Sequence, residues 1–394
     1  MKVLMFSWEF PPHMVGGLGQ HMYDLSRFLV AKNVAVHIIT PRVKGAPDRE
    51  IINGANIHRV GRPSSEEDNF KSWTFMFNSE AIREAIRLNS EAGGFDVIHA
   101  HDWLVAYAGR SVSKIFEIPL VTTIHATEHG RNLGLHNRTQ MEINEIEKNL
   151  ALEADHVICC SHYMQDEICS LFGLAPEDVT IIPNGVDPEQ FLPAPESEAE
   201  EADLPEKIVF FIGRLVPEKG VWQLVSCFPR VLEKVPDAHL YIGGRGPQLE
   251  ALQDLSVELG IEEQVCFTGF LQHKERNRIY HHASVAVFPS LYEPFGIVAL
   301  EAMATGTPVI VGDVGGLSEI ISDGKNGLKV TPGDEDELAD AIIRLLTEPE
   351  FAERLNRQAA KEVMSVYNWD QIAQKTLEVY QRASKASNKR RFVG

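Results

Sequence analysis

The chain has 394 residues, of which 44% are hydrophobic and 24% charged, and its formal net charge is −19. This composition is typical of a globular protein, and the length predicts two domains of roughly 200 residues each. The negative charge argues against nucleic acid or an anionic membrane surface as the main partner.

The five cysteines form no C-x-x-C pair, and most of them lie in apolar runs, so we interpret them as reduced thiols. The opening residues MKVLMFSWEF are not typical of a signal peptide, because their short apolar run leads directly into a glycine-rich loop. No apolar stretch approaches the ~20 residues that span a bilayer. We therefore expect a soluble, cytoplasmic protein, and the sequence indicates no particular oligomeric state.

Short β-rich runs alternate with amphipathic stretches along residues 1–186. The predicted helices cover residues 20–31, 79–89 and 138–153, and the predicted strands are VLMFSW, AVHIIT, IHRVGR, DVIHAH, LVTTIH, HVICCS and VTIIP. This alternation indicates βαβ units that form a parallel sheet covered on both faces.

Residues 187–206 interrupt the pattern with eight acidic residues, four prolines and no basic residue, which is typical of a linker. A second α/β series follows over residues 207–366, then a helix at 367–385 and a basic tail at 386–394. The second series contains the predicted strands KIVFFIG, HLYIGG, VCFTGF, SVAVFP and PVIVGD, with helices near 220–234, 247–259, 275–281, 296–304, 335–346 and 349–366. We expect two Rossmann-like domains and a ligand at the carboxyl ends of their strands, in a cleft between them.

The first glycine loop, residues 14–19, connects a strand to a helix and contains Gly16 and Gly17. Both glycines permit φ > 0, and the following helix N-terminus favours a phosphate. The spacing differs from the dinucleotide fingerprint, and a tight packing turn remains an alternative.

Two further polar clusters follow strands, at residues 99–103 (HAHDW) and 123–131 (TIHATEHGR). His99 and His101 share one face of their strand and Asp102 points to the other, which argues against a joint metal site. We interpret Asp102 as a polar ligand-binding residue or a structural carboxylate. His125, at a strand tip, is a candidate donor to a sugar hydroxyl or a phosphate, with His129 and Arg131 as weaker candidates.

In the second domain, Arg214 and Lys219 lie on the first strand–loop–helix junction. A guanidinium and an ammonium on one loop can bind a diphosphate that gains charge as it leaves. Gly243 and Gly244 follow the next strand and either approach a nucleotide or form a packing turn.

Residues 288–320 contain Glu293 in a loop and Glu301 eight residues later in a helix. Phe295 and Gly296 precede that helix, whose first N–H groups favour an anion. One carboxylate on each side of this anion site suits the two ends of a nucleotide-sugar.

Taken together, these motifs resemble the retaining glycosyltransferases of the GT-B fold (glycosyl transferases group 1), and especially the glycogen and starch synthases. The resemblance covers the whole chain and implies an acceptor-side domain at 1–186 and a nucleotide-sugar-binding domain at 207–366. It implies that Arg214 and Lys219 hold the donor diphosphate, that Glu293 contacts the sugar, and that Glu301 contacts the ribose.

The resemblance also implies that Asp102 and His125 line the sugar and acceptor side and that Gly17 approaches the phosphates. The donor-binding residues so implied are Gly16, Gly17, Arg214, Lys219, Gly243, Gly244, Phe295, Gly296, Ile297, Val298 and Glu301. It implies no cofactor and no metal, with retention through a front-face route in which the departing phosphate helps to deprotonate the acceptor. Met14 stands where glycogen synthases usually have Lys, which removes one donor-side cation.

The leading hypothesis is transfer of glucose from ADP- or UDP-glucose to a 4-hydroxyl of an α-glucan. Alternatives keep the chemistry but use glucose 1-phosphate, another sugar or a lipid as acceptor, or replace transfer by epimerisation of the nucleotide-sugar. A lipid acceptor is disfavoured, because residues 1–186 carry 16 Lys and Arg against 23 Asp and Glu. A non-catalytic nucleotide-sugar-binding protein is the remaining alternative, and the cations aimed at the diphosphate argue against it.

Overall fold

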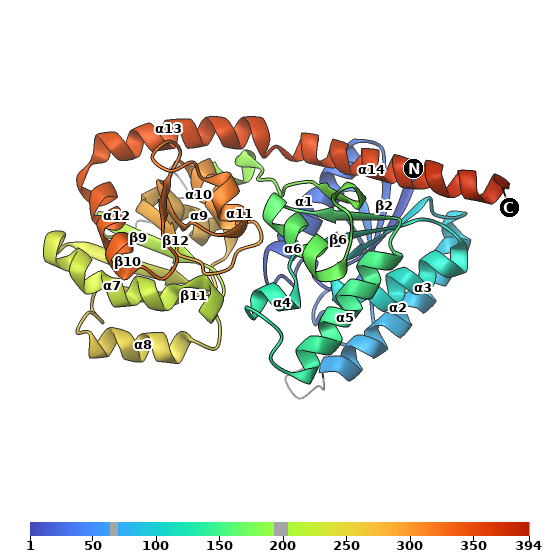
Figure 1. Cartoon of the computed structure of the whole chain (residues 1–394), viewed down its shortest axis with the longest axis horizontal. Helices are drawn as coiled ribbons and strands as arrows, with labels where there is room; N and C mark the ends of the chain where they lie inside the picture. The colour runs from blue at the N-terminus through green and yellow to red at the C-terminus, as the bar shows by residue number, and fades with distance from the viewer. Residues whose placement is uncertain (64–69, 193–203, 394) are drawn as a thin grey trace. The chain divides into compact units, whose positions relative to one another are not determined.

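The computed structural model describes residues 1–63, 70–192 and 204–393, which divide into two compact α/β units (Figure 1). Unit 1 combines Met1–Asn184 with Trp369–Gly394, and unit 2 comprises Gly185–Asn368. From the sequence we expected the first domain to end at 186, the second to begin at 207 after a linker, and the last helix to begin at 367.

Unit 1 is built on an eight-stranded sheet with the order β3-β4-β2-β1-β5-β6-β7-β8. Every neighbouring pair is parallel except β3 and β4, which are antiparallel at the sheet edge. The strands are β1 (Lys2–Phe6), β2 (Ala35–Pro41), β3 (Arg49–Ile52), β4 (Ala55–Val60), β5 (Val97–His101), β6 (Leu120–Ile124), β7 (His156–Cys159) and β8 (Val179–Ile181). β3 was not predicted.

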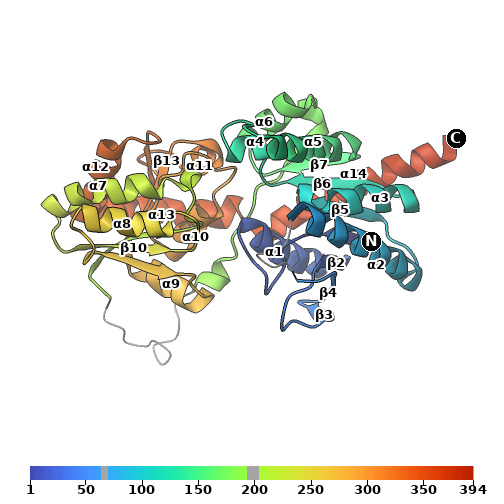
Figure 2. The ribbon, with the colours of Figure 1, turned by 90° about the horizontal axis from the view of Figure 1, so that it is seen from below.

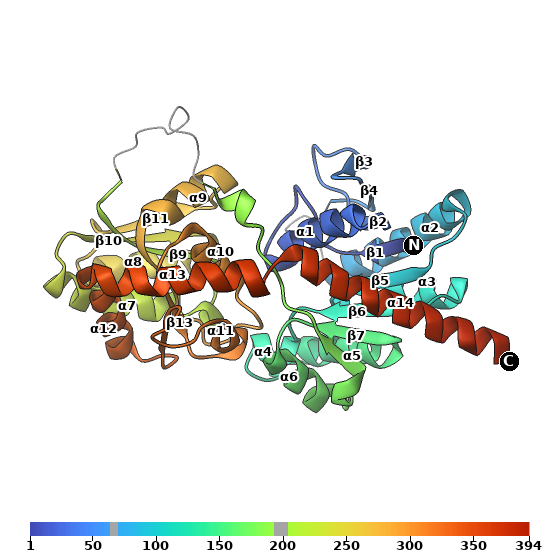
Figure 3. The same cartoon turned by 90° about the horizontal axis from the view of Figure 1, so that it is seen from above.

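Helices cover both faces of this sheet, because alternate strand residues point to opposite sides. Val3 and Met5 of β1 join a core with α1 and α14, whereas Leu4 and Phe6 join a core with α2 and α3. Figure 3 shows α1 and α14 side by side. The helices are α1 (Gly17–Ala31), α2 (Phe70–Ala92), α3 (Ala106–Phe116), α4 (Glu128–Arg131), α5 (Arg138–Glu153), α6 (His162–Phe172) and α14 (Trp369–Val393), with 3-10 turns η1 (Trp103–Val105) and η2 (Pro176–Asp178).

Unit 2 contains a six-stranded parallel sheet with the order β11-β10-β9-β12-β13-β14. Helices α7 and α8 pack against each other (Figure 2), and α10 packs against both α9 and α13. The strands are β9 (Lys207–Ile212), β10 (Ala238–Gly243), β11 (Val265–Gly269), β12 (Ala283–Phe288), β13 (Val309–Gly312) and β14 (Leu328–Val330). The helices are α7 (Val221–Lys234), α8 (Leu249–Glu258), α9 (His273–His282), α10 (Ile297–Thr305), α11 (Gly315–Ile320), α12 (Glu335–Thr347) and α13 (Pro349–Val366), with 3-10 turns η3 (Pro188–Phe191) and η5 (Pro217–Lys219).

The expected linker and tail differ from the structure. The start of the linker forms η3, which is bound to unit 2 because Asn277 and His281 of α9 hydrogen-bond to the carbonyl oxygens of Gln190 and Phe191. Residues 193–203 of the linker lie outside the described residues. The expected basic tail continues helix α14 to Val393. In the described ranges, no helix is both long enough and apolar enough to cross a membrane.

Candidate active site

In unit 1, β5 ends with two histidines on the face that α1 and α14 cover. The ring centroids of His99 and His101 are 4.0 Å apart, so both rings point the same way, as the sequence predicted. His99 Nδ1 lies 2.7 Å from the Tyr380 hydroxyl, and its Nε2 lies 2.8 Å from Thr123 Oγ1. His99 therefore has a partner at each nitrogen and connects α14 to the sheet.

Asp102 follows β5 in an unusual backbone conformation, with φ 62° and ψ 174°. A non-glycine residue in such a region costs about 1–3 kcal/mol and is found most often at functional sites. Its Oδ1 accepts the backbone N–H of His125 at 2.7 Å. Burial raises the pKa of Asp102 to about 6, although the Arg131 guanidinium, 3.8 Å away, acts in the opposite direction.

His125 follows β6 and is partly exposed, with Nε2 3.2 Å from Nδ1 of His101. Burial lowers the pKa of His125 to about 3, and the positive charge of Arg131 lowers it further. Its ring is therefore neutral at pH 7 and can exchange a hydrogen bond with a sugar hydroxyl without introducing a charge. Asp102 and His125, both predicted site residues, are brought together.

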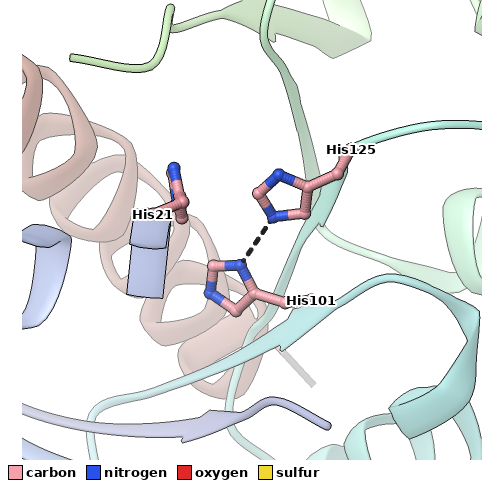
Figure 4. Close-up of side chains that lie close together, drawn as sticks. All are labelled: His21, His101 and His125. Atoms are coloured by element: carbon pink, nitrogen blue, oxygen red, sulfur yellow. Dashed lines mark hydrogen bonds between the residues drawn. The ribbon is translucent and has the colours of Figure 1, made fainter. Parts of the chain in front are cut away.

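His21 was missed by sequence reasoning. It lies on α1, one turn after Gly17, with its ring centroid 4.7 Å from that of His125. Its Nδ1 is 2.7 Å from Asn184 Oδ1. Figure 4 shows His21, His101 and His125 converging, and one ring nitrogen of each lies within 4.8 Å of those of the other two. The only sequence signal was a histidine one turn after a glycine loop.

The N–H groups of the glycine loop are bound by a carboxylate of the chain itself, which agrees with the packing-turn alternative, and a donor contact by this loop stays a prediction. Glu9 Oε2 accepts the backbone N–H groups of Val15 at 2.8 Å and Gly16 at 3.0 Å. Gly16 has an extended φ of −159°, and Gly17 begins α1, so neither residue uses the positive φ that a glycine permits. The close approach is at Gly19 instead, where a Cβ would lie 3.1 Å from Glu9 Oε2.

A buried carboxyl group on α5 supports the loop that follows β6. Both oxygens of Glu147 accept the backbone N–H of Glu128 at 3.0 Å. Burial raises the pKa of Glu147 to about 8, so the group is mostly protonated at pH 7. One turn later, Arg131 reaches Asp102, so of the two weaker candidates the structure connects Arg131, and not His129, to the predicted site.

In unit 2, the loops after β9 and β12 bring a predicted cation and a predicted carboxylate together. Lys219 Nζ donates to Glu293 Oε2 at 2.6 Å, and Glu293 is 9% exposed. Arg214, on the same loop as Lys219, is half-exposed and pairs with Glu218 at 3.3 Å. The backbone N–H of Leu291 donates to the Glu218 carbonyl oxygen, which fixes one loop against the other.

Two glycines are required by the close packing of these loops. A Cβ on Gly220, where φ is 67°, would lie 2.0 Å from the carbonyl oxygen of Pro289. A Cβ on Gly244, where φ is 126°, would lie 1.8 Å from the carbonyl oxygen of Gly213. The packing-turn alternative therefore accounts for Gly244, and a donor contact by Gly243 or Gly244 stays a prediction.

Glu301 of α10 is buried and held by two residues that sequence reasoning missed. Arg276 of α9 donates to its Oε1 at 3.0 Å, and the Tyr280 hydroxyl lies 3.3 Å from Oε2. Burial raises the pKa of Glu301, whereas Arg276 lowers it. Arg276 also lies over the ring of Phe191. Arg276 and Tyr280 are four residues apart and so lie on one face of α9, a helix composed mainly of charged and polar residues.

Helix α10 begins one residue after the start that the sequence predicted, and its binding of an anion stays a prediction. Gly296 precedes the helix with φ 106°, and a Cβ there would lie 2.4 Å from Leu317. Phe295 is buried, whereas Ile297 and Val298 of the first turn are partly exposed. The expected cleft between the two units stays a prediction.

Comparison with known proteins identifies the class. Residues 195–362 match glycosyl transferases group 1, and residues 15–190 match glycosyltransferase family 4. An uncharacterized glycosyltransferase of Methanocaldococcus jannaschii is 38% identical, with 97% of this chain and 98% of that protein covered. A glycogen synthase of Mycobacterium tuberculosis is 34% identical, with 98% and 95% covered. The chain belongs to the glycosyl transferases group 1.

A solved sucrose-phosphate synthase from Thermosynechococcus elongatus superimposes with a TM-score of 0.84 at 27% identity, covering 98% of this chain and 99% of that one. The fold is therefore GT-B, with two parallel-sheet α/β domains, and the protein is a glycosyltransferase. These matches are to transferases, and none of them supports the epimerase alternative.

Proposed function

We propose that this enzyme transfers glucose from ADP- or UDP-glucose to a 4-hydroxyl of an α-glucan, with retention and without a metal cofactor. The glycogen synthase of M. tuberculosis, which aligns over nearly the whole chain, supports the glucan acceptor. The five free thiols support a cytoplasmic location.

The 2.6 Å contact between Lys219 and Glu293 carries the proposal. An ammonium has three N–H donors, and Glu293 accepts one of them, so two remain for diphosphate oxygens. Arg214 on the same loop adds a planar guanidinium. As the bond between C1 of the sugar and the diphosphate breaks, these cations stabilise the charge that the leaving group gains.

Glu301 provides the ribose contact in this proposal. Its carboxylate has further acceptor positions beyond those used by Arg276 and Tyr280, and these suit the two ribose hydroxyls. The partly exposed first turn of α10 lies between Glu293 and Glu301 in sequence and suits a phosphate.

In unit 1, the neutral ring of His125 suits a hydroxyl of the transferred sugar, and Asp102 orients that ring through the backbone. The acceptor oxygen forms the new bond to C1, and its proton passes to the departing phosphate. Neutralisation of that phosphate by side chains supports chemistry that needs no metal ion.

The direct test incubates the full chain with ADP-glucose or UDP-glucose, with and without glycogen, in the presence of EDTA. Released nucleotide and elongated glucan are both measured. We expect both products only when glycogen is present, and EDTA should leave the rate unchanged. Nucleotide release without glucan elongation would refute the acceptor assignment.

Lys219→Ala tests the diphosphate role. We expect kcat/KM to fall by roughly 10²–10³, the usual effect of removing one donor that stabilises transition-state charge. Lys234→Ala, at the exposed end of α7, is the matched control and should retain full activity. A merely twofold loss in Lys219→Ala would remove the assignment.

The same chemistry with a small acceptor, such as glucose 1-phosphate or another sugar, is the second candidate. Met14 stands in the place of the usual cation of glycogen synthases, and its Cγ would lie 3.1 Å from a Cβ on Gly19, so it packs against the first turn of α1. The name of the sucrose-phosphate synthase neighbour also points to a small product. Transfer to glucose 1-phosphate, measured beside glycogen in the same assay, discriminates the two.

A further inference from the structure

Three histidines of unit 1 meet although they come from separate parts of the chain. His21 lies on α1, His101 ends β5, and His125 follows β6 (Figure 4). The odd-numbered residues of β5 point toward the face covered by α1, which brings His101 to His21. Since β6 is the neighbour of β5, its end places His125 beside both.

One nitrogen of each ring lies near the other two rings. Two of the ring nitrogens have no hydrogen-bond partner among the described residues. His21 Nδ1 faces Asn184 Oδ1 at 2.7 Å, and because an amide oxygen only accepts, Nδ1 carries the proton and Nε2 carries the lone pair. Within the described residues, the buried Nε2 atoms of His21 and His101 have no hydrogen-bond partner. Buried polar atoms of this kind are rare, and a bound ion is one explanation for them.

This arrangement has the form of a metal site. A histidine that binds a metal usually donates its other ring N–H to an oxygen, as His21 does to Asn184. Zn–N bonds of about 2.0–2.1 Å in a tetrahedral site separate two nitrogens by about 3.4 Å. Nδ1 of His101 and Nε2 of His125 are already 3.2 Å apart, and one ring nitrogen of each of the three histidines lies within 4.8 Å of those of the other two.

The ligand chemistry selects the ion. Three imidazoles suit zinc, copper, nickel and cobalt, whereas magnesium and calcium prefer oxygen ligands. The Asp102 carboxylate, which binds the backbone N–H of His125, contributes negative charge, and Arg131 opposes it. A hydrogen-bonded network of neutral rings accounts for the His101–His125 contact but leaves Nε2 of His21 without a partner.

We propose that His21, His101 and His125 bind one divalent transition-metal ion of the zinc class, and that this ion inhibits the enzyme. The inhibition rests on the proposed function. In that function the ring of His125 binds the transferred sugar, and a metal ion bound to the same ring would prevent this contact. Catalysis itself remains independent of metal. His125, which is partly exposed, marks the side from which the ion enters.

The site is tested with the full chain after removal of metal, using Co²⁺ as a probe because its tetrahedral complexes absorb visible light. We expect one Co²⁺ per chain, displaced by Zn²⁺. In His21→Gln, affinity should fall by roughly tenfold or more, whereas His282→Gln, at an exposed position of α9, should bind as the wild type does. A wild-type chain that binds neither ion overturns the site, and so does equal affinity in a folded His21→Gln chain.

The inhibition has its own measurement. Zn²⁺ at the concentration that fills the site should lower glucose transfer, EDTA should restore it, and His21→Gln should need roughly tenfold more Zn²⁺. Full activity in a Zn²⁺-saturated wild-type chain overturns the inhibitory role. If no donor and acceptor support transfer, the proposed function fails, while the Co²⁺ titration still decides whether the site exists.

Discussion

Replacing Glu147 by glutamine should change how the stability of unit 1 depends on pH. Glu147 is 2% exposed, and burial raises its pKa from 4.5 to about 8. The folded chain therefore keeps a proton that the unfolded chain loses above its ordinary pKa. Because the folded state binds more protons between pH 4.5 and 8, the free energy of unfolding falls as pH rises through that window.

The size of the effect follows from the pKa. One pKa unit corresponds to about 1.4 kcal/mol, so the ionisation of Glu147 destabilises unit 1 by at most about 5 kcal/mol at pH 8. The amide side chain in Glu147→Gln cannot ionise, so this dependence should disappear. Replacing one oxygen by an amide nitrogen also loses one contact with the Glu128 N–H, which costs about 1 kcal/mol at every pH. The test is therefore the slope of the free energy of unfolding against pH, and not a constant difference between the two chains.

The assay is urea unfolding at intervals from pH 5 to pH 9, followed by tryptophan fluorescence. Four of the five tryptophans lie in unit 1, so the signal reports mainly on the unit that contains Glu147. Glu145→Gln, at an exposed position of the same helix, is the control and should follow the wild type. Parallel profiles for wild type and Glu147→Gln between pH 5 and pH 8 would refute the reasoning.

Other positions give further expectations. Arg276→Ala leaves Glu301 buried without its cation, and we expect the KM for the donor to rise roughly tenfold or more; an unchanged KM would contradict the ribose assignment. Gly244→Ala places a methyl group 1.8 Å from a backbone oxygen and should lower the melting temperature far more than Gly260→Ala, where φ is 66° but nothing lies within 4 Å; equal losses would show strain alone. Wild-type transfer should decline as pH falls through about 6, where Asp102 takes up a proton, and a similar decline in Asp102→Asn would assign it to another group.

Sequence patterns predicted helices well where local signals were strong. The helix at 138–153 was placed correctly, and the Asn137 side chain caps it by accepting the Gln140 N–H. The helix predicted at 79–89 begins at Phe70, because Trp73 and Phe77 of its first turns are buried and stack on each other despite their weak helix propensity. The edge strand β3 has no alternating apolar pattern that could reveal it.

Some residues of the candidate site could be proposed from the sequence, and others could not. Lys219 and Glu293 were found because both follow strands of one parallel sheet, whose carboxyl ends share an edge. Arg276 and Glu147 were missed, because their role depends on a tertiary contact with one particular partner. Glu9 was missed since nothing in the sequence shows that its carboxylate binds the glycine loop six residues later.

Helix α14 also has a consequence for the order of folding during synthesis. Trp369 and Tyr380 are buried in the core that α1 and the first strands form, although they are synthesised after the whole of unit 2. Unit 2 is one continuous segment and can fold before helix α14, which completes unit 1, has been synthesised. Most of unit 1 is therefore synthesised first but completes its folding after unit 2. In a chain truncated after residue 368, a protease should degrade unit 1 well before unit 2.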